Sequence, residues 1–270
     1  MCVGIQISTH TLKICFYPYP PLRNLEKVEK INPYHNDSRQ KEKQVEAMFD
    51  AIAPAYDFMN RAMTFGLDRL WLRRLLAEAS ACKPGDIADL ATGTGDVALA
   101  LSRRIPAAKV TGIDLSEGML DKAREKAATQ GADIDFRQAD CLNTGLPDSS
   151  FDLVTIAYGV RNFADIAAGY REMARILRPG GKLAVLELST PTAAWTKPFY
   201  KLYTRSLIPL AGSLIAGDRS AYAYLPESIA AAPQRQRMTA LMEDAGLENA
   251  SFRSLTLGVC TLYIAFKPRL

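Results

Sequence analysis

The pattern of apolar and polar residues changes character along the chain. Before about residue 40 it has no clear period, and a Tyr-Pro-Tyr-Pro-Pro run at 17–21 interrupts it. From Gln44 onward apolar residues recur at helical spacing, and a second amphipathic helix is predicted over 68–80. We therefore expect a disordered or extraneous N-terminal tail over 1–40 and one folded domain over 41–270.

Short apolar runs then alternate with amphipathic stretches. The runs predict strands at 87–91, 109–114, 134–139, 151–158 and 182–189, and the stretches predict helices at 96–104, 117–129 and 165–177. Ser116 is a candidate N-cap of the 117–129 helix, and Gly131 a candidate residue just past its end. A helix over 233–245 precedes two closing strands, 252–257 and 259–267. This order predicts an α/β fold with a doubly wound, mostly parallel, seven-stranded sheet.

Composition excludes several classes of protein. The 270 residues are 48% hydrophobic and carry a net charge of +4 without a long run of like charges, so nucleic acid is not an expected partner. No apolar stretch reaches the length of about 18 residues that a membrane-spanning helix needs. The five cysteines form no C-x-x-C pair, as in a reduced cytoplasmic protein. His10 and His35 both precede the expected domain, which excludes a Ser-His-Asp hydrolase and makes a metal site unexpected.

A glycine-rich turn is the strongest chemical signal. The run I-A-D-L-A-T-G-T-G at 87–95 places Gly93 and Gly95 between a strand and a helix, and Asp114 ends the next strand 19 residues after Gly95. Glycines let the backbone approach a ligand, and a carboxylate about 20 residues further on can bind ribose hydroxyls. Asp89, just ahead of the glycines, suits a cationic ligand better than a pyrophosphate. The turn therefore predicts a site for a nucleoside cofactor.

Further candidates follow from the rule that such sheets bind ligands at the carboxyl ends of their strands. It adds Thr94 after the first strand of the sheet, and Asp140 and Cys141 after the third. Each also has a plainer explanation, Thr94 and Asp140 as turn residues and Cys141 as a small packing residue. Residues 157–160 read A-Y-G-V, which lacks the N/D-P-P-Y type motif of enzymes that methylate the amino groups of nucleic-acid bases.

Three longer blocks carry a family resemblance. They are M-F-D-A-I-A-P-A-Y-D-F-M-N at 48–60 with T-F-G-L-D at 64–68 and Trp71, Y-G-V-R-N at 158–162, and R-I-L-R-P-G-G-K-L-A-V-L-E-L-S at 175–189. These blocks resemble the ubiquinone/menaquinone biosynthesis C-methyltransferase family, from about residue 44 to 267. The chain departs from the family pattern at Thr64 and Asp68, where Ser and His are frequent, and at Thr92 and Ala157.

The resemblance implies the class I methyltransferase fold and S-adenosyl-L-methionine as the cofactor. It implies methylation of a ring carbon of demethylmenaquinol, or of the benzoquinol intermediate of ubiquinone synthesis, and the sequence does not separate these acceptors. An NAD-dependent oxidoreductase is the alternative from a different class, since G-x-G-x-x-A also fits a dinucleotide turn.

The implied chemistry selects candidate catalytic residues. Carbon is a poor nucleophile unless the neighbouring hydroxyl ionises, so the site must stabilise a phenolate. Arg161 suits that role because it stays charged and donates in a fixed fork; a surface ion pair is the alternative. Asn162 is expected to hold the loop. Tyr56 and Asp57 are candidates for orienting groups or accepting protons, as is Asp96, although Tyr56 and Asp57 also fit a helix-end turn.

Residues 191–230 break the alternation of strands and helices and carry aromatic residues on both sides of an apolar run. We expect this segment to form a lid over a prenylated quinol; packing of its helices against the core is the alternative. Such a substrate resides in a membrane, which implies a cytoplasmic protein with transient contact at the inner face of the membrane. The sequence leaves the oligomeric state open.

Overall fold

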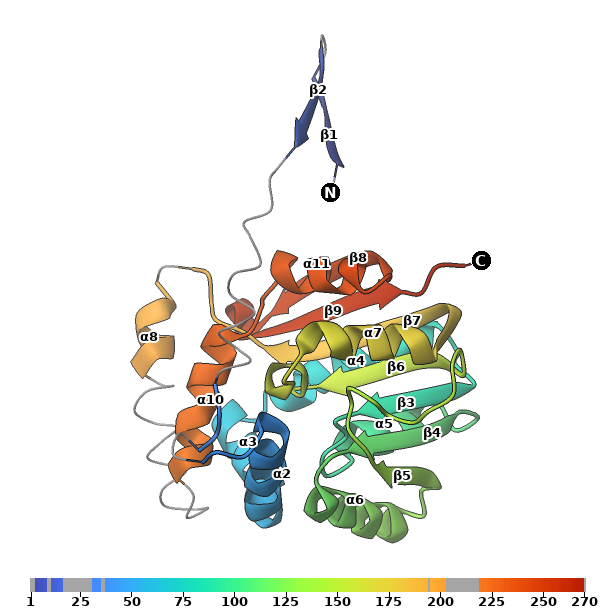
Figure 1. The fold of residues 1–270 in the computed structure, drawn as a ribbon, viewed down its shortest axis with the longest axis vertical. Helices are drawn as coiled ribbons and strands as arrows, with labels where there is room; N and C mark the ends of the chain where they lie inside the picture. Colours follow the sequence, from blue (N-terminus) through green and yellow to red (C-terminus); the bar gives the residue numbers. More distant parts are fainter. Residues whose placement is uncertain are drawn as a thin grey trace.

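A computed structural model describes residues 3–8, 11–16, 31–34, 37–193, 195–202 and 219–269. Its centre is a seven-stranded sheet in the order β5-β4-β3-β6-β7-β9-β8 (Figure 1). The strands are β3 (Asp86–Leu90), β4 (Lys109–Asp114), β5 (Ile134–Gln138), β6 (Phe151–Ala157), β7 (Leu177–Leu188), β8 (Glu248–Leu255) and β9 (Cys260–Phe266). The first five of these pair in parallel and β9 pairs antiparallel with both neighbours, which confirms the predicted fold class.

Helices cover both faces of the sheet. They are α2 (Lys41–Ile52), α3 (Tyr56–Thr64), α4 (Asp68–Ala81), α5 (Asp96–Arg104), α6 (Glu117–Gln130), α7 (Ile166–Ile176), α8 (Lys197–Leu202), α10 (Arg219–Ala231) and α11 (Gln236–Asp244). Side chains of α7 and α11 pack with Ala88 and Leu90 of β3, whereas side chains of α4 and α5 pack with Ile87. This alternation along β3 is what a strand buried on both faces requires.

Several predicted elements are confirmed in position and others begin or end elsewhere. The helix at 96–104 and the strand at 109–114 have the predicted bounds. Ser116 caps α6 by accepting a hydrogen bond from the Met119 backbone N–H at 3.1 Å, and Gly131 follows the helix with φ +62°. The prediction for β7 was wrong at its start, because the strand begins at Leu177. Its Pro-Gly-Gly segment lies within the strand, where the register with β6 shifts, and not in a turn.

The N-terminal segment contains two strands that the sequence pattern does not predict. The backbones of β1 (Val3–Ser8) and β2 (Thr11–Phe16) form an antiparallel pair separate from the large sheet. The other residues before Ile31 lie outside the described ones. Residues 31–40 contact the domain through Gln44, whose side chain accepts from the Tyr34 N–H and donates to two backbone carbonyls. The expected boundary at residue 41 stays a prediction.

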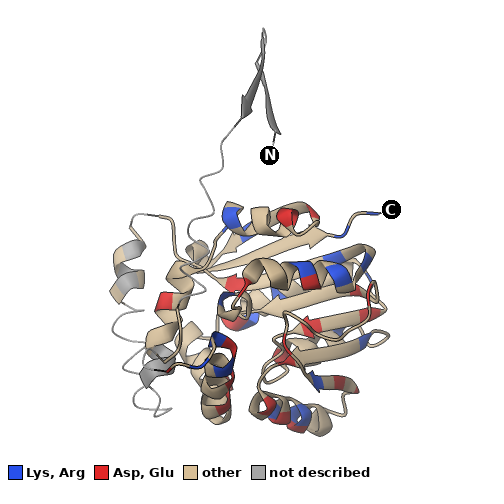
Figure 2. Cartoon of the chain, viewed as in Figure 1, with Lys and Arg blue, Asp and Glu red and all other residues tan. Residues whose placement is uncertain are grey.

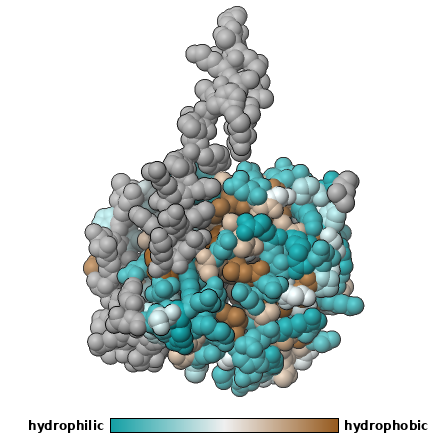
Figure 3. Space-filling model, in the orientation of Figure 1, coloured by the Kyte–Doolittle hydropathy of each residue, from teal (hydrophilic) through white to brown (hydrophobic). Residues whose placement is uncertain are grey.

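The charged residues of the described chain are interspersed. Acidic and basic side chains alternate along α6 and α7 and do not gather into one patch in this view (Figure 2). The same face is mostly hydrophilic, with apolar surface near its middle (Figure 3). Within the described residues, no helix combines the length and the hydropathy needed to cross a membrane.

Candidate active site

Two adjoining cavities open at the carboxyl ends of the parallel strands. Helices α2, α3 and α10 lie at this end of the sheet (Figure 1). The larger has a volume of about 460 Å³ and the smaller about 80 Å³. Five residues line both: Tyr56, Ala91, Gly93, Ala157 and Tyr158. The glycine-rich turn therefore lies where the two cavities meet. This arrangement would let two molecules that react with each other bind side by side.

The glycine-rich turn is closed by the carboxylate predicted to bind ribose. Asp114 Oδ2 accepts a hydrogen bond from the Gly93 N–H at 2.7 Å, and Oδ1 accepts from the Ser116 N–H at 2.9 Å. Burial raises the pKa of Asp114. Gly93 has φ +55°, and a Cβ built there would meet no atom within 4 Å. Asp114 and Gly93 both line the smaller cavity, so a ligand can approach the open side of the turn.

Gly95 has a different role from Gly93. It lines neither cavity, and a Cβ placed on it would lie 2.9 Å from the Cβ of Ala123 in α6. With φ +80°, this position needs glycine both for its backbone conformation and for close packing of the turn against α6. The structure therefore shows a packing role for Gly95, and its predicted part in cofactor binding stays a prediction.

Asp89 lies beneath the turn, at the end of β3. Its carboxylate accepts hydrogen bonds from the hydroxyls of Thr92 and Thr155, both at 2.6 Å. The side chain is buried, and burial raises its pKa to about 6. It lines the larger cavity. A carboxylate held by two neutral hydroxyls and no described cation retains its charge above that pKa, and so can attract a cationic ligand.

Asp140 and Cys141 line the far wall of the smaller cavity. Asp140 Oδ1 accepts from the Leu142 N–H at 2.9 Å, so it forms a turn as well as facing the cavity. Cys141 is buried, and burial raises the pKa of its thiol, so it remains a neutral packing group. Met119 and Leu142 supply apolar surface beside them, which suits a flat heterocycle.

Arg161 forms a buried ion pair that the sequence interpretation did not foresee. Its Nη1 lies 2.8 Å from Oε1 of Glu187, and its backbone N–H donates to Oε2 at 3.2 Å. Nη1 also donates to the Tyr158 carbonyl. The alternative of a surface ion pair is therefore wrong: Arg161 does form an ion pair, but both side chains of the pair are buried. Arg161 Nε has no partner among the described residues, although Arg161 lines the larger cavity.

Asp57 is held in a polar cluster at the start of α3. Lys126 Nζ lies 2.8 Å from Asp57 and 2.5 Å from Asp96, and it donates to the Thr94 hydroxyl at 2.9 Å. The Thr94 hydroxyl in turn donates to Asp57 at 2.5 Å. The cluster ties α3 to the glycine-rich turn and to α6. The predicted roles of Asp57 in catalysis and of Thr94 in cofactor binding stay predictions. Lys126 is a member of the cluster that the sequence interpretation missed.

Asn162 connects the strand end to the segment expected to be a lid. Its Oδ1 accepts from the Tyr224 hydroxyl of α10 at 3.2 Å. The described parts of 191–230 include α8 and α10, and this segment adds six residues to the larger cavity. Tyr200 comes from α8, Leu225 and Ile229 come from α10, and Pro191, Trp195 and Thr196 precede α8. Residues 203–218 lie outside the described ones. Segment 191–230 thus contributes one wall of the cavity, whereas its function as a moving lid stays a prediction.

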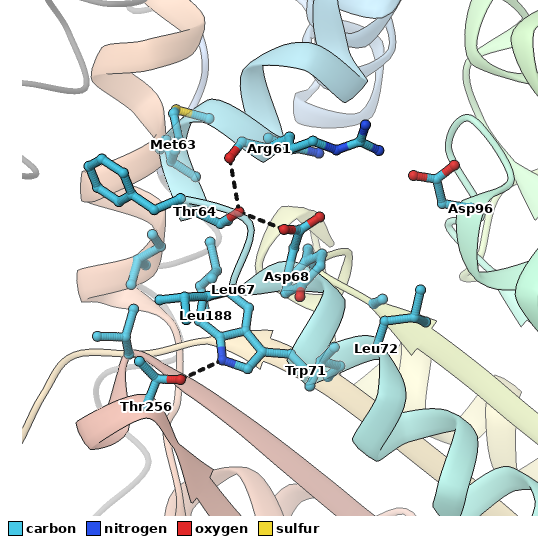
Figure 4. Close-up of a pocket in the computed structure, with 18 of the residues that line it drawn as sticks. Arg61, Met63, Thr64, Leu67, Asp68, Trp71, Leu72, Asp96, Leu188 and Thr256 are labelled. Atoms are coloured by element: carbon cyan, nitrogen blue, oxygen red, sulfur yellow. Dashed lines mark hydrogen bonds between the residues drawn. The ribbon is translucent and has the colours of Figure 1, made fainter.

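The opposite wall of the larger cavity comes from α3 and α4. Figure 4 shows Thr64 donating to Asp68 at 2.8 Å and the Trp71 indole N–H donating to Thr256 at 2.7 Å. The sequence interpretation treated Thr64 and Asp68 only as departures from a family pattern. It missed Glu187 as well. A lone acid within the apolar run of a buried strand was the available signal for Glu187.

Comparison with known proteins bears on this arrangement. The family model described as the ubiE/COQ5 methyltransferase family matches residues 37–267. The chain belongs to that family. It is 43% identical over 241 residues to a demethylmenaquinone methyltransferase of Bacteroides fragilis, covering 88% of this chain and 98% of the relative.

Two further similarities extend the comparison. The ubiquinone/menaquinone biosynthesis C-methyltransferase UbiE of Geotalea daltonii is 40% identical over 231 residues, covering 84% of this chain and 98% of that relative. The solved structure of phosphoethanolamine N-methyltransferase 2 of Haemonchus contortus, in complex with S-adenosyl-L-methionine, superposes with a TM-score of 0.50 at 15% identity. That match covers 68% of this chain and 49% of the other. These findings confirm the expected family and fold.

Proposed function

We propose that this chain transfers a methyl group from S-adenosyl-L-methionine to a ring carbon of demethylmenaquinol. The observation that carries the proposal is the place of Arg161, a buried cation with an unpartnered Nε at the wall of an apolar cavity that adjoins the glycine-rich turn. A phenolate formed on a quinol is the anion that such a cation would stabilise. The demethylmenaquinone methyltransferase of Bacteroides fragilis supports this choice of acceptor.

The residues of the turn fit S-adenosyl-L-methionine. The smaller cavity suits the adenosine, with Asp114 directed to the ribose hydroxyls and Asp140 and Cys141 beside the adenine. Gly93 leaves the space that a ligand close to the backbone needs. The Asp89 carboxylate would attract the positive charge on the methionine part of the donor. When bound, the donor supplies an electrophilic methyl group on a sulfonium.

The larger cavity fits a prenylated ring. Its wall combines apolar side chains from α4, β7, α10 and the 256–259 segment with polar side chains, among them the buried guanidinium of Arg161. A second arginine, Arg61 of α3, lines the same cavity. Arg161 would hold the ring oxygen, Glu187 would hold Arg161, and Asn162 would hold the loop through Tyr224. Tyr56, which lines both cavities, would separate and orient the two molecules. This division of roles requires the reduced acceptor, because a quinone has no hydroxyl to ionise.

The mouth of the larger cavity supports a transient contact with the membrane surface. Phe65, Trp195 and Leu257 line the cavity and are 79%, 64% and 63% exposed. Apolar side chains at the entrance of a site for a membrane-borne substrate can insert at the interface of lipid headgroups and acyl chains. Co-sedimentation with vesicles of mixed neutral and anionic lipids should fall for Phe65→Ser with Trp195→Ser. Equal binding by the double variant would contradict the contact.

The benzoquinol intermediate of ubiquinone synthesis is the second acceptor to test, supported by the UbiE relative of Geotalea daltonii. The purified protein would be incubated with S-adenosyl-L-methionine and chemically reduced demethylmenaquinone or the reduced benzoquinone. Mass spectrometry should find the naphthoquinol heavier by one methyl group. Methylation of the benzoquinol alone would replace the acceptor. Binding of NADH in place of S-adenosylhomocysteine, with no methylated product, would overturn the proposal.

A further inference from the structure

Ionising the acceptor hydroxyl requires a group that takes its proton, and the described wall of the larger cavity offers few such groups. No histidine lines this wall. Its carboxylates are four aspartates, Asp57, Asp68, Asp89 and Asp96. These four aspartates differ in their hydrogen-bond and ion-pair partners.

Three of the four aspartates are occupied by partners. Asp57 and Asp96 share the Lys126 ammonium at 2.8 and 2.5 Å, so both carboxylates are already engaged with a cation. Asp89 accepts from two threonine hydroxyls and lies beneath the turn, where the cationic part of the donor would be. Each of these three carboxylates thus has a role that competes with taking a proton from the acceptor.

Asp68 has no cation partner among the described residues and keeps one unoccupied oxygen, a combination that none of the other three aspartates has. Its Oδ1 accepts from the Thr64 hydroxyl at 2.8 Å, and among the described residues it forms no ion pair with a lysine or arginine. It is the first residue of α4, and it is half-buried. In Figure 4 the charged groups around it are Arg61, from α3, and Asp96, from α5, and the Arg61 guanidinium extends toward Asp96.

Tyr158 places Asp68 and Arg161 around the same part of the cavity. Burial raises the pKa of the Tyr158 hydroxyl, and the negative charge of Asp68 raises it further, as does that of Glu187. The Tyr158 carbonyl accepts from Arg161, and the Tyr158 hydroxyl has no partner among the described residues. Asp68, Tyr158 and Arg161 all line the larger cavity, so the carboxylate and the guanidinium border the same space.

We propose that Asp68 is the catalytic base that removes the hydroxyl proton of the acceptor, with Thr64 orienting its carboxylate. This proposal rests on the function proposed above. The O–H bond breaks as the proton moves to Asp68, and Arg161 stabilises the resulting phenolate. The ring carbon then forms a bond to the methyl carbon while the carbon–sulfur bond breaks and its electron pair stays on sulfur. The ring carbon loses its own proton to water, the ring becomes aromatic again, and the oxygen regains a proton from Asp68. One proton is released in total.

The test compares Asp68→Asn with Asp68→His. Asparagine retains an oxygen that can accept from Thr64 but cannot take a proton, so kcat should fall about 10²-fold or more while the affinity for S-adenosylhomocysteine is unchanged. Histidine can take a proton, so it should restore much of kcat and move the acidic limb of the kcat profile toward higher pH. Thr64→Val, which only frees the carboxylate to rotate, should lower kcat by a smaller factor.

The matched control is Asp135→Asn, which removes an exposed carboxylate paired with Arg137 on β5 and should leave kcat unchanged. Melting temperature and S-adenosylhomocysteine binding establish that each variant is folded. If Asp68→Asn does not fold, the kcat profile of Asp68→His decides, because an acidic limb unmoved from the wild type would overturn the proposal. Wild-type kcat in Asp68→Asn would overturn it directly. Absence of any methyl transfer by the wild-type protein would instead refute the proposed function.

Discussion

Arg161 and Glu187 form a buried ion pair across the carboxyl ends of the neighbouring strands β6 and β7, with Nη1 and Oε1 2.8 Å apart. Their side chains are only 7% and 2% exposed. Glu187 also receives the Arg161 backbone N–H and the Leu188 N–H, so both of its oxygens are used. The pair fixes a buried guanidinium at the wall of the larger cavity.

Removing Glu187 should be costly for the fold. Glu187→Ala leaves the Arg161 charge buried without its partner, which is expected to lower the free energy of unfolding by about 3–5 kcal/mol. Urea denaturation at neutral pH measures the change. The control is Glu117→Ala, which breaks an exposed ion pair with Arg124 and should cost at most about 1 kcal/mol. Similar losses for the two variants would contradict the importance of burial.

Arg161 should act on the rate of methyl transfer and not on binding of the donor. Arg161→Lys keeps a charge but loses the planar fork, so turnover should fall; Arg161→Ala should lose about 10²–10³-fold if one transition-state donor contributes ~3–4 kcal/mol. Both variants should bind S-adenosylhomocysteine with near-normal affinity. Methyl transfer to a chemically reduced acceptor is the measurement, and equal wild-type activity on the oxidised quinone would argue against the phenolate.

Asp114 should determine affinity for the cofactor. Asp114→Ala removes a charged acceptor for the ribose hydroxyls and the carboxylate that closes the turn at Gly93, which should cost roughly 1.5–3 kcal/mol of binding free energy. That corresponds to a dissociation constant about 10- to 150-fold higher. Isothermal titration with S-adenosylhomocysteine measures it. An unchanged dissociation constant in a folded variant would reject the assignment.

Asp89 should make the stability depend on pH. Its folded-state pKa of about 6 lies above the ordinary value of 3.8, so the folded protein binds the proton more tightly. This contribution is fully present below pH 3.8 and is lost as the pH rises through 6. A difference of about two pH units corresponds to roughly 3 kcal/mol. Relative to wild type, Asp89→Asn should therefore gain unfolding free energy between pH 4 and pH 7. A constant difference between the two proteins over that range would contradict the raised pKa.

Gly95 and Gly131 allow backbone strain to be separated from packing. Both have φ near the left-handed region, +80° and +62°, so alanine should cost about 1–2 kcal/mol at either position. Only at Gly95 would the new Cβ meet a neighbour, Ala123, at 2.9 Å. Gly95→Ala should therefore lose a further 1–3 kcal/mol or so through overpacking. Thermal unfolding of the two variants tests this, and equal melting temperatures would assign no role to packing.

Local sequence signals predicted most of the sheet and its helices. The Ser116 cap and the apolar face of 96–104 are set by residues within one or two helical turns, and the structure places them as expected. The Pro-Gly-Gly segment misled the prediction of β7, because its register shift within the strand depends on pairing with β6. The sequence interpretation placed the segment before the strand.

The site was predicted less completely, since its polar contacts join distant residues. Lys126 reaches Asp57, 69 residues away, and Arg161 reaches Glu187, 26 residues away. No periodicity or short motif encodes such pairs. The candidate roles of Arg161, Asn162 and Tyr56 came from a family resemblance, whereas the partners that hold Arg161 and Asn162 required the fold.

The antiparallel direction of β9 has a consequence for synthesis of the protein. Because β9 runs against β7, its first residue, Cys260, lies beside Leu188, and the segment before it reaches the larger cavity. Thr256, Leu257 and Val259 are thus translated after every other residue of that cavity's described wall. The last residue that lines the smaller cavity, Ala164, is translated 92 residues before Thr256. During synthesis, the residues that line the smaller cavity would therefore all be present well before the last residues that line the larger cavity.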